Sequence, residues 1–529
     1  FWFKRAMWAE PGPFAIASIA AARYLLVASK FLLGLAVLLP LALLQLLAYV
    51  AVFGLYLPFH IALSSTNKDF APSKAAASHQ DNTLHRLSSD LADARAACDF
   101  PRMSSLLEEA LTPDLAGALQ VGGASSERLA NEVCLALGQL ASRPMRGAKA
   151  LLQQLKQSFG RSCLFLSGGG MLGMYHLGSI RRMLQESALP DQICGTSVGS
   201  IVGAYLATRT DQELLEDLSC PDEWYRQMGP EIGPFPLSWM RIVPKVLRTG
   251  FIYDHMGQYH GAGQFVSRGL TFAEAYARSG RTLTITCTPA AGGPVLMLNR
   301  HNAPSVLVAS ALTASSSMPL LTEPVTLLER LADGTVRPWP GAFETPMRDG
   351  TLAAGAPSEM SQLLNVRWSI VSQLNPHVVP FCFPSFVAEN LARKAPALSA
   401  VLASEQWLRC GFWSTLRRFQ AWTGLPRKGG WISALLFQEY FGDVNLVHHE
   451  IGLTDYLHLV QNERSREHFF SKVERSAQAA EPYLQQLRLR HRVQEALRLF
   501  QKAAPAARGR HAPRQNRLDI RRRRTGMRS

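Results

Sequence analysis

The sequence predicts an α/β protein in which a sheet domain is flanked by helices and preceded by a membrane-embedded apolar segment and a helical region. Three observations lead to this prediction. From Cys163 to about Pro380, short apolar runs alternate with glycine-rich turns and helical stretches, as they do in α/β sheets. Residues Phe31 to Phe59 carry no charge. Between these two segments, amphipathic helical patterns such as MSSLLEEAL recur.

The uncharged run predicts a membrane anchor over residues 1–63. As a helix, residues 31–59 would be roughly 43 Å long, against about 30 Å of bilayer hydrocarbon. The run therefore fits a single tilted or kinked span with Pro40 inside it, or a hairpin that enters one leaflet and returns. A buried helix pair is the third possibility. Four basic residues precede the run: Lys4, Arg5, Arg23 and Lys30. By the positive-inside rule the N-terminal side is cytoplasmic, and a hairpin would keep the later domains there too.

The rest of the chain divides by composition. We expect a polar linker, a helical N-terminal region, the sheet domain, a helical extension and a basic, disordered tail, over residues 64–92, 93–160, 161–380, 381–480 and 481–529. The tail holds 14 Lys/Arg and 3 Asp/Glu, so +11 of the chain's net charge of +15 lies there. Such a tail favours anionic lipid surfaces. Nucleic acid is not expected as a partner, because the tail lacks interleaved aromatic residues.

The eight cysteines indicate no metal centre. None forms a C-x-x-C pair, and no His/Cys cluster has zinc spacing. We expect free thiols in a reducing compartment, and neither a metal nor another cofactor.

The segment CLFLSGGGMLGMYHLGSI predicts a strand, a tight glycine loop at residues 168–170 and a helix. Glycines at such a turn let backbone N–H groups converge on an anion, either a phosphate or the oxyanion of an acyl intermediate. Gly168, Gly170 and Gly173 also fit G-x-G-x-x-G, so a dinucleotide site is an alternative. It is less favoured, because no acidic residue ends a second strand about 20 residues further on.

The second motif, GTSVG at residues 195–199, predicts a nucleophilic serine. A sharp turn between a strand and a helix lifts a serine hydroxyl clear of the backbone, and small flanking residues let the turn close. Gly195 and Gly199 supply them around Ser197, with QIC as the strand and SIVGAYLATR as the helix.

The serine needs a base, and the sequence offers two candidates. Asp349 precedes Gly350 in a loop between apolar segments, where it could complete a Ser–Asp dyad, although Asp-Gly is also a common turn. His377 would be the histidine of a Ser-Asp-His triad, or a structural residue after a turn proline.

The set SGGGMLGMYHLG, GTSVGS and DG resembles the patatin-like phospholipase domain family. The resemblance implies an α/β fold, a Ser–Asp dyad and a glycine-rich oxyanion loop. Carried over, Ser197 is the nucleophile and Asp349 the base. Four residues would provide oxyanion N–H groups: Gly168, Gly169, Gly170 and Met171. Four motif glycines would shape the loops: Gly173, Gly195, Gly199 and Gly350.

Further segments, among them SVLVASALTASSSMPLL, resemble the triacylglycerol lipases of plant oil mobilisation and of yeast lipid droplets. This branch implies a carboxylic ester hydrolase of lipid catabolism. We expect a neutral lipid or phospholipid substrate and a location at a lipid droplet or the endoplasmic reticulum membrane, with the catalytic domain in the cytoplasm.

Two positions depart from the family's pattern. Leu172 stands where patatins carry arginine, and Gly355 stands where the lipases usually carry an acid. Gly355 keeps a non-catalytic, membrane-bound lipid-binding scaffold open as an alternative. Because the substrate is a hypothesis, a phospholipase, a lysophospholipase or an acyltransferase of the same fold is a further alternative.

Overall fold

The computed structural model describes most of the chain outside its two ends and a long stretch after residue 380. The described residues are 74–112, 123–142, 147–229, 239–253, 263–291, 294–318, 321–341, 345–350, 360, 362–376, 379, 442–448 and 451–503. The predicted membrane anchor at residues 1–63 lies outside them. Among the residues that are described, no helix is both long and apolar enough to cross a bilayer.

The centre of the molecule is a seven-stranded sheet in the order β4-β3-β2-β1-β8-β9, with β7 also paired to β3. Its strands are β1 (Arg161–Leu166), β2 (Gln192–Gly195), β3 (Thr282–Pro289), β4 (Leu296–Asn299), β7 (Met347–Asp349), β8 (Val366–Gln373) and β9 (Val444–Val447). Neighbours among β1, β2, β3, β8 and β9 are parallel, whereas β4 and β7 run antiparallel to β3. A separate antiparallel pair joins β5 (Leu328–Arg330) to β6 (Val336–Pro338). The predicted α/β class is confirmed.

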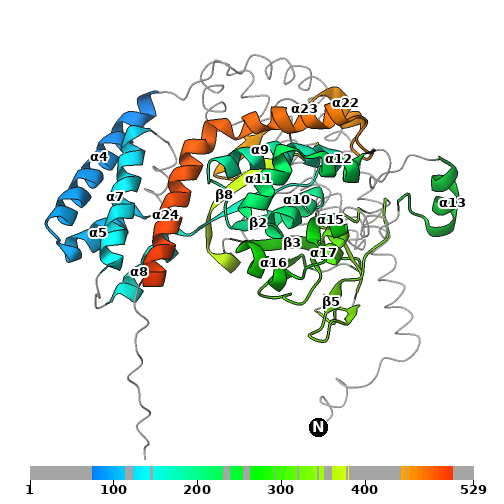
Figure 1. Ribbon diagram of the computed structural model, residues 1–529, viewed down its shortest axis with the longest axis horizontal. Helices are drawn as coiled ribbons and strands as arrows, with labels where there is room; N and C mark the ends of the chain where they lie inside the picture. The colour runs from blue at the N-terminus through cyan, green and yellow to red at the C-terminus, as the bar shows by residue number, and fades with distance from the viewer. Residues whose placement is uncertain are drawn as a thin grey trace, which may run out of the picture.

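Helices flank this sheet (Figure 1). Those around it are α9 (Tyr175–Gln185), α10 (Val198–Ala207), α11 (Asp211–Ser219), α12 (Asp222–Met228), α15 (Gln264–Ser267), α16 (Phe272–Ser279), α17 (Val308–Ser315), α22 (Leu453–Leu457) and α23 (Arg466–Ser476). The main core joins strand residues such as Leu164, Ile193 and Leu283 to helix residues such as Leu177 and Val202. Strands β1, β2 and β3 are buried along nearly their whole length, although β3, with the sequence TLTITCTP, alternates threonine with apolar residues.

A helical module forms a second core beside the sheet. It contains α4 (Lys74–Ala96), α5 (Phe100–Ala110), α7 (Ala124–Ala141) and α8 (Ala148–Phe159), together with α24 (Leu484–Ala503) from the other end of the chain. Figure 1 shows α24, in red, lying along these blue and cyan helices. Leu489, Val493 and Leu497 of α24 are buried in their shared core.

Three predicted boundaries are wrong. The expected linker at 64–92 is helical from Lys74, and Leu84, Leu87 and Leu91 are buried. The tail expected from residue 481 begins with an ordered helix, because apolar residues recur along one face of α24. The sheet also continues beyond residue 380, since β9 lies inside the region expected to be a helical extension.

Six cysteines lie among the described residues and are not joined in disulfides: Cys98, Cys134, Cys163, Cys194, Cys220 and Cys287.

Candidate active site

Ser197 lies at the turn between β2 and α10, the position that the sequence predicts for a nucleophile. Its backbone has φ 53° and ψ −127°, a conformation that side-chain-bearing residues rarely adopt. The Ser197 N–H donates to Ser315 Oγ at 3.0 Å, and its carbonyl accepts the N–H of Ser200 at 2.8 Å. The turn is therefore held in a strained geometry by hydrogen bonds on both sides of the serine.

The two glycines that flank this turn are required by close backbone approach. A Cβ at Gly199 would overlap the carbonyl oxygen of Leu166 at the end of β1, and a Cβ at Gly195 would overlap the backbone of Gly199. The prediction that small residues let the turn close therefore has a direct physical basis at both positions.

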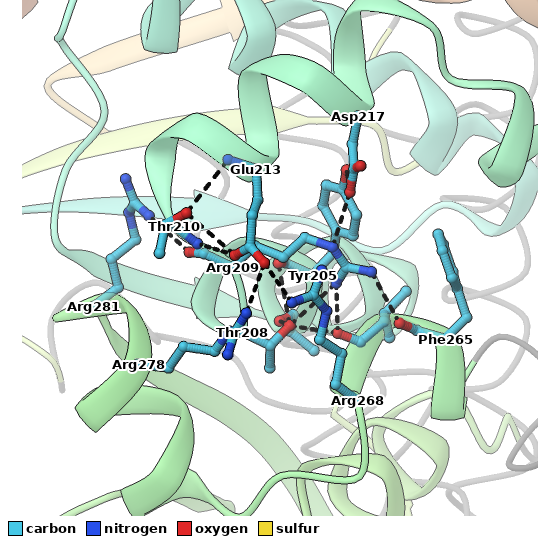
Figure 2. A network of polar contacts seen from close by, with 12 residues as sticks. Tyr205, Thr208, Arg209, Thr210, Glu213, Asp217, Phe265, Arg268, Arg278 and Arg281 are labelled. Atoms are coloured by element: carbon cyan, nitrogen blue, oxygen red, sulfur yellow. Dashed lines mark hydrogen bonds and ion pairs between the residues drawn. The ribbon is translucent and has the colours of Figure 1, made fainter.

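The opposite end of α10 is fixed by a polar network (Figure 2). Arg209 donates to the carbonyl oxygens of Phe265 and Val266 at 3.1 Å each, and it pairs with Asp217 at 3.1 Å. Its guanidinium also lies 4.1 Å from the ring centroid of Tyr205. Burial lowers the pKa of Arg209, and these acceptors hold the buried cation. The helix that begins after Ser197 is thus fastened at both ends.

Asp349 reaches the same place through the pairing of β7. On one edge of β3, β2 pairs with residues 282–285, and on the other edge β4 pairs with residues 284–287. β7 pairs with residues 287–289, so it must share the edge that β2 occupies. Thr286 alone separates the two strands along this edge.

The carboxyl ends of β2 and β7 point toward each other at Thr286. Gly195 pairs with Ile285 on one side, and Asp349 pairs with Cys287 on the other. The hydroxyls of Thr196 and Thr286 are 2.7 Å apart. A Cβ at Gly350 would overlap the carbonyl oxygen of Thr286. Both predicted loops, 152 residues apart at Ser197 and Asp349, therefore converge on one residue of β3.

The end of α17 and the segment that follows it position both candidate residues. Ser315 accepts the Ser197 N–H, and two residues later the Ser317 carbonyl accepts the Asp349 N–H at 3.1 Å. The Asp349 carbonyl accepts the Thr288 hydroxyl at 2.9 Å, and its side chain is buried. Burial, reinforced by the charge of Asp349, raises the pKa of the Cys287 thiol. Cys287 therefore stays protonated beside the carboxylate and is a poor nucleophile.

The glycine loop follows β1 and leads into a short 3₁₀ helix, η3 (Gly170–Met174), before α9. Gly169 and Gly170 have φ of 149° and 56°, and a Cβ on either would overlap a carbonyl oxygen, of Leu374 and of Leu459 respectively. Gly173 packs directly against the Val198 side chain. The loop therefore lies next to the helix that carries the nucleophile turn.

One predicted oxyanion donor is wrong. The Met171 N–H donates to the Leu459 carbonyl at 2.9 Å, so it is used within the protein. The N–H groups of Gly168, Gly169 and Gly170 are the remaining candidates. Leu459 comes from a segment almost 300 residues away, and the local sequence of the loop gives no sign of this contact.

A buried ionic cluster holds that distant segment in place. Lys472 of α23 contacts Glu463 at 2.7 Å and Asp455 at 3.3 Å, and all three side chains are almost fully buried. Asp455 also accepts the hydroxyl of Tyr175, at the start of α9, at 3.0 Å. Burial opposes ionisation of Asp455, but the Lys472 ammonium, the Gly452 N–H and the Tyr175 hydroxyl hold its pKa below the usual value. Sequence reasoning missed this cluster because its members are scattered charges.

A buried histidine lies on the other side of the glycine loop. His176 is fully buried, with Nδ1 2.7 Å from Ser372 Oγ and Nε2 3.1 Å from the Ser167 carbonyl. Burial lowers its pKa to about 4, so the ring is neutral at pH 7. Ser372 also contacts His448 at 3.2 Å. This chain of polar contacts runs from β8 and β9 to the residue preceding Gly168.

The alternative base, His377, and the departure at Gly355 lie outside the described residues. Within the part of the chain that the structure describes, no group of three or more His, Cys, Asp or Glu side chains could hold a metal ion.

Part of the chain is similar to known proteins. Residues 164–342 match the family model of patatin-like phospholipases. The chain is 32% identical over 355 residues to a patatin-like phospholipase domain-containing protein of Neosartorya fischeri, which covers 65% of this chain and 48% of the relative. It is 31% identical over 369 residues to one from Aspergillus terreus, covering 68% and 50%. It is 36% identical over 239 residues to one from Coccidioides immitis, covering 45% and 32%. The chain spans about half the length, or less, of these curated relatives.

Proposed function

Because the chain contains a domain of the patatin-like phospholipase family, we propose that it is a serine lipid acyl hydrolase. Ser197 acts as the nucleophile and Asp349 as the general base. One observation carries the proposal. The turn of Ser197 and the end of β7 at Asp349 meet on the same edge of β3, at Thr286. This arrangement suits a dyad, which needs one carboxylate near the serine hydroxyl.

In the proposed reaction, Asp349 accepts the proton of the Ser197 hydroxyl while the serine oxygen attacks the acyl carbonyl. The oxyanion is held by backbone N–H groups of residues 168–170, and each such donor is worth roughly 3 kcal/mol. The intermediate collapses, the alcohol leaves with the proton from Asp349, and an acyl-enzyme remains. Water then gives a proton to Asp349 and attacks the acyl-enzyme. The fatty acid leaves, and Asp349 returns the proton to Ser197.

Triacylglycerol is the proposed substrate, on the strength of the resemblance to oil-mobilising and lipid-droplet lipases. Phospholipid or lysophospholipid hydrolysis and acyl transfer to an alcohol use the same dyad. We further propose that the enzyme works at a lipid droplet or the endoplasmic reticulum membrane, attached through residues 1–63.

Release of fatty acid from triolein and from phosphatidylcholine tests the activity and the substrate. We expect wild type to cleave triolein, Ser197→Ala and Asp349→Asn to be inactive, and His377→Ala to keep its activity. Cleavage of phosphatidylcholine alone would exclude the triacylglycerol assignment. Loss of activity in His377→Ala, with Asp349→Asn active, would replace the dyad with a histidine-based mechanism.

A fluorophosphonate probe distinguishes the enzyme from a non-catalytic scaffold, because only an activated serine reacts with it. We expect wild type to be labelled and Ser197→Ala to be unlabelled. A folded wild type that resists the probe and cleaves no acyl ester would favour the scaffold.

A further inference from the structure

Helix α13 (Trp239–Thr249) has two chemically different faces. Its sequence, WMRIVPKVLRT, contains three basic residues and no acidic one. At about 100° per residue, positions 239, 243, 246 and 247 fall on one side of the helix and positions 241, 245 and 248 on the other. The first set is apolar throughout, and the second is Arg, Lys and Arg.

Three side chains on the apolar side of α13 are exposed to solvent. The exposed fractions of Val243, Val246 and Leu247 are 50%, 37% and 83%. These are three of the eight large apolar side chains that are exposed among the described residues. Figure 1 shows α13 standing apart at the edge of the molecule, away from the other labelled helices. An apolar stripe this exposed is typical of an interaction site and not of a packing face.

The chain that follows α13 returns to the candidate active site. The N–H groups of Ile252 and Tyr253 both donate to the Leu321 carbonyl, at 3.0 and 2.8 Å. Leu321 lies four residues after Ser317, whose carbonyl holds Asp349. The Tyr253 hydroxyl donates to the Val460 carbonyl at 3.0 Å, and Val460 follows the residue that holds Met171 of the glycine loop.

We propose that α13 is an interfacial helix that docks the protein on a phospholipid surface carrying anionic headgroups. The side chains at positions 243, 246 and 247 enter the acyl layer, while the basic positions face the headgroup phosphates. Helices with a Lys/Arg face opposite an apolar face lie in a membrane interface in this way. The absence of acidic residues from α13 makes the charge complementarity to anionic lipid complete along the helix.

The contacts of Ile252 and Tyr253 link the docking of α13 to the position of the candidate active site. They connect the base of the helix to the segments that hold Asp349 and the glycine loop. Docking through α13 therefore brings the candidate active site to the lipid surface. This last step rests on the proposed function, whereas the docking itself does not.

Amide hydrogen exchange tests the docking directly. The full chain carrying Ser197→Ala is mixed with vesicles of phosphatidylcholine alone, or of phosphatidylcholine and phosphatidylserine. We expect the amides of residues 239–249 to be protected by the mixed vesicles and to lose that protection in high salt, which screens the basic face. Because exchange is resolved along the chain, binding through residues 1–63 does not obscure the result.

Two matched pairs of variants identify the groups responsible. Leu247→Asp should abolish the protection, whereas Leu499→Asp, on an exposed face of α24, should preserve it. Arg248→Glu should weaken it, whereas Lys502→Glu, exposed at the end of α24, should not. Unprotected residues 239–249 on mixed vesicles would overturn the proposal. So would the same protection in concentrated protein without lipid, which would assign the helix to a second copy of the chain.

Activity measurements separate this proposal from the proposed function. On vesicle-bound substrate, Leu247→Asp should lower the rate by more than about tenfold, since it removes a leucine that would enter the acyl layer and places a charge there. On a water-soluble p-nitrophenyl ester, its rate should equal that of wild type, which also shows that it is folded. If the wild type hydrolyses neither substrate, the proposed function fails, and the exchange experiment still decides the docking.

Discussion

The hydroxyl oxygens of Thr196 and Thr286 lie 2.7 Å apart, and their hydrogen bond joins the nucleophile turn to β3, the strand with which β7 pairs. Thr196 precedes Ser197, and Thr286 precedes the residue that pairs with Asp349. Two loops distant in sequence thus share one polar contact, which helps to set the spacing of the proposed dyad.

Replacing Thr286 by valine should lower kcat by about tenfold while leaving KM near its wild-type value. The change keeps the shape of the side chain but leaves the Thr196 hydroxyl without this partner, at a cost of about 1–3 kcal/mol. Steady-state kinetics on a soluble ester would measure the effect.

Thr284→Val is the matched control for this prediction. Thr284 lies on the same face of β3, and its buried hydroxyl makes no hydrogen bond within the part of the chain that the structure describes. Its replacement should leave kcat unchanged and stability unchanged or slightly raised. Equal losses of kcat in both variants would mean that the Thr196–Thr286 bond has no special role.

Ser315→Ala should lower kcat by about tenfold, because the strained Ser197 backbone loses the acceptor of its N–H. Ser310→Ala provides the comparison. Ser310 also lies in α17 and accepts a backbone N–H, that of Leu328 at 3.0 Å, but it does not contact the nucleophile turn. Thermal unfolding should show similar destabilisation of both variants, of about 1–3 kcal/mol. A fall in kcat for Ser310→Ala as large as that for Ser315→Ala would remove the positioning role.

The parts of the site that the sequence predicts are those that local chemistry determines. GTSVG identifies its own turn because Gly195 and Gly199 must approach neighbouring backbone, and the glycine loop does so for the same reason. The meeting of Ser197 and Asp349 depends on strand pairing at β3. The family resemblance decided between Asp349 and the other Asp-Gly pair of the chain, Asp333–Gly334.

The parts that the sequence does not predict depend on contacts between distant segments. Residues 484–503 are rich in Arg, so their composition suggested a solvated tail, yet Arg490 is itself buried. It donates to Ser162 Oγ at 3.0 Å and to the Phe159 carbonyl at 2.7 Å, which join α24 to β1 and α8. Burial lowers its pKa to about 9. The prediction of a disordered tail relied on charge and overlooked the apolar face of α24, which completes the core of the helical module.

The burial of His176 predicts a loss of stability in acid. Its pKa is about 4 in the folded protein and 6.5 ordinarily, so the unfolded chain binds more protons between these values. The contribution of the neutral ring is complete above pH 6.5 and falls as the pH drops toward 4, by about 3 kcal/mol in all.

Urea unfolding of wild type and His176→Gln at pH 7 and pH 5 would measure this dependence. Glutamine is polar and does not titrate. Between pH 7 and pH 5 the variant should therefore lose about 2 kcal/mol less of its free energy of unfolding than wild type loses. The same pH dependence in both proteins would show that His176 is not the titrating group.

Lys472→Met should lower the free energy of unfolding by about 3–5 kcal/mol, because it removes the buried ammonium from the carboxylates of Asp455 and Glu463 and leaves the partly exposed His468 ring as their remaining ion-pair partner. Hydrolysis should fall as well, since these residues bracket Leu459, which contacts the glycine loop. Arg466→Met, in the same helix, removes an exposed pair with Asp222 and an exposed contact with the Phe470 ring, and should cost about 1 kcal/mol. Chemical unfolding of both variants would decide whether burial makes the difference.

Gly170→Ala should reduce hydrolysis by about 100-fold or more. Gly170 has φ 56°, and an added Cβ would overlap the carbonyl oxygen of Leu459, the acceptor that fixes the Met171 N–H. The loop would have to move by a large fraction of an ångström, and displaced oxyanion donors cost about 3 kcal/mol each.

Gly280→Ala separates this effect from backbone strain. Gly280 ends α16 with φ 72°, and its Cβ would meet no atom within 4 Å. That variant should lose about 1 kcal/mol of stability and keep full activity. If both glycine variants retained activity on a soluble ester, the close contact between Gly170 and Leu459 would not control the loop, and the oxyanion donors would have to be sought elsewhere.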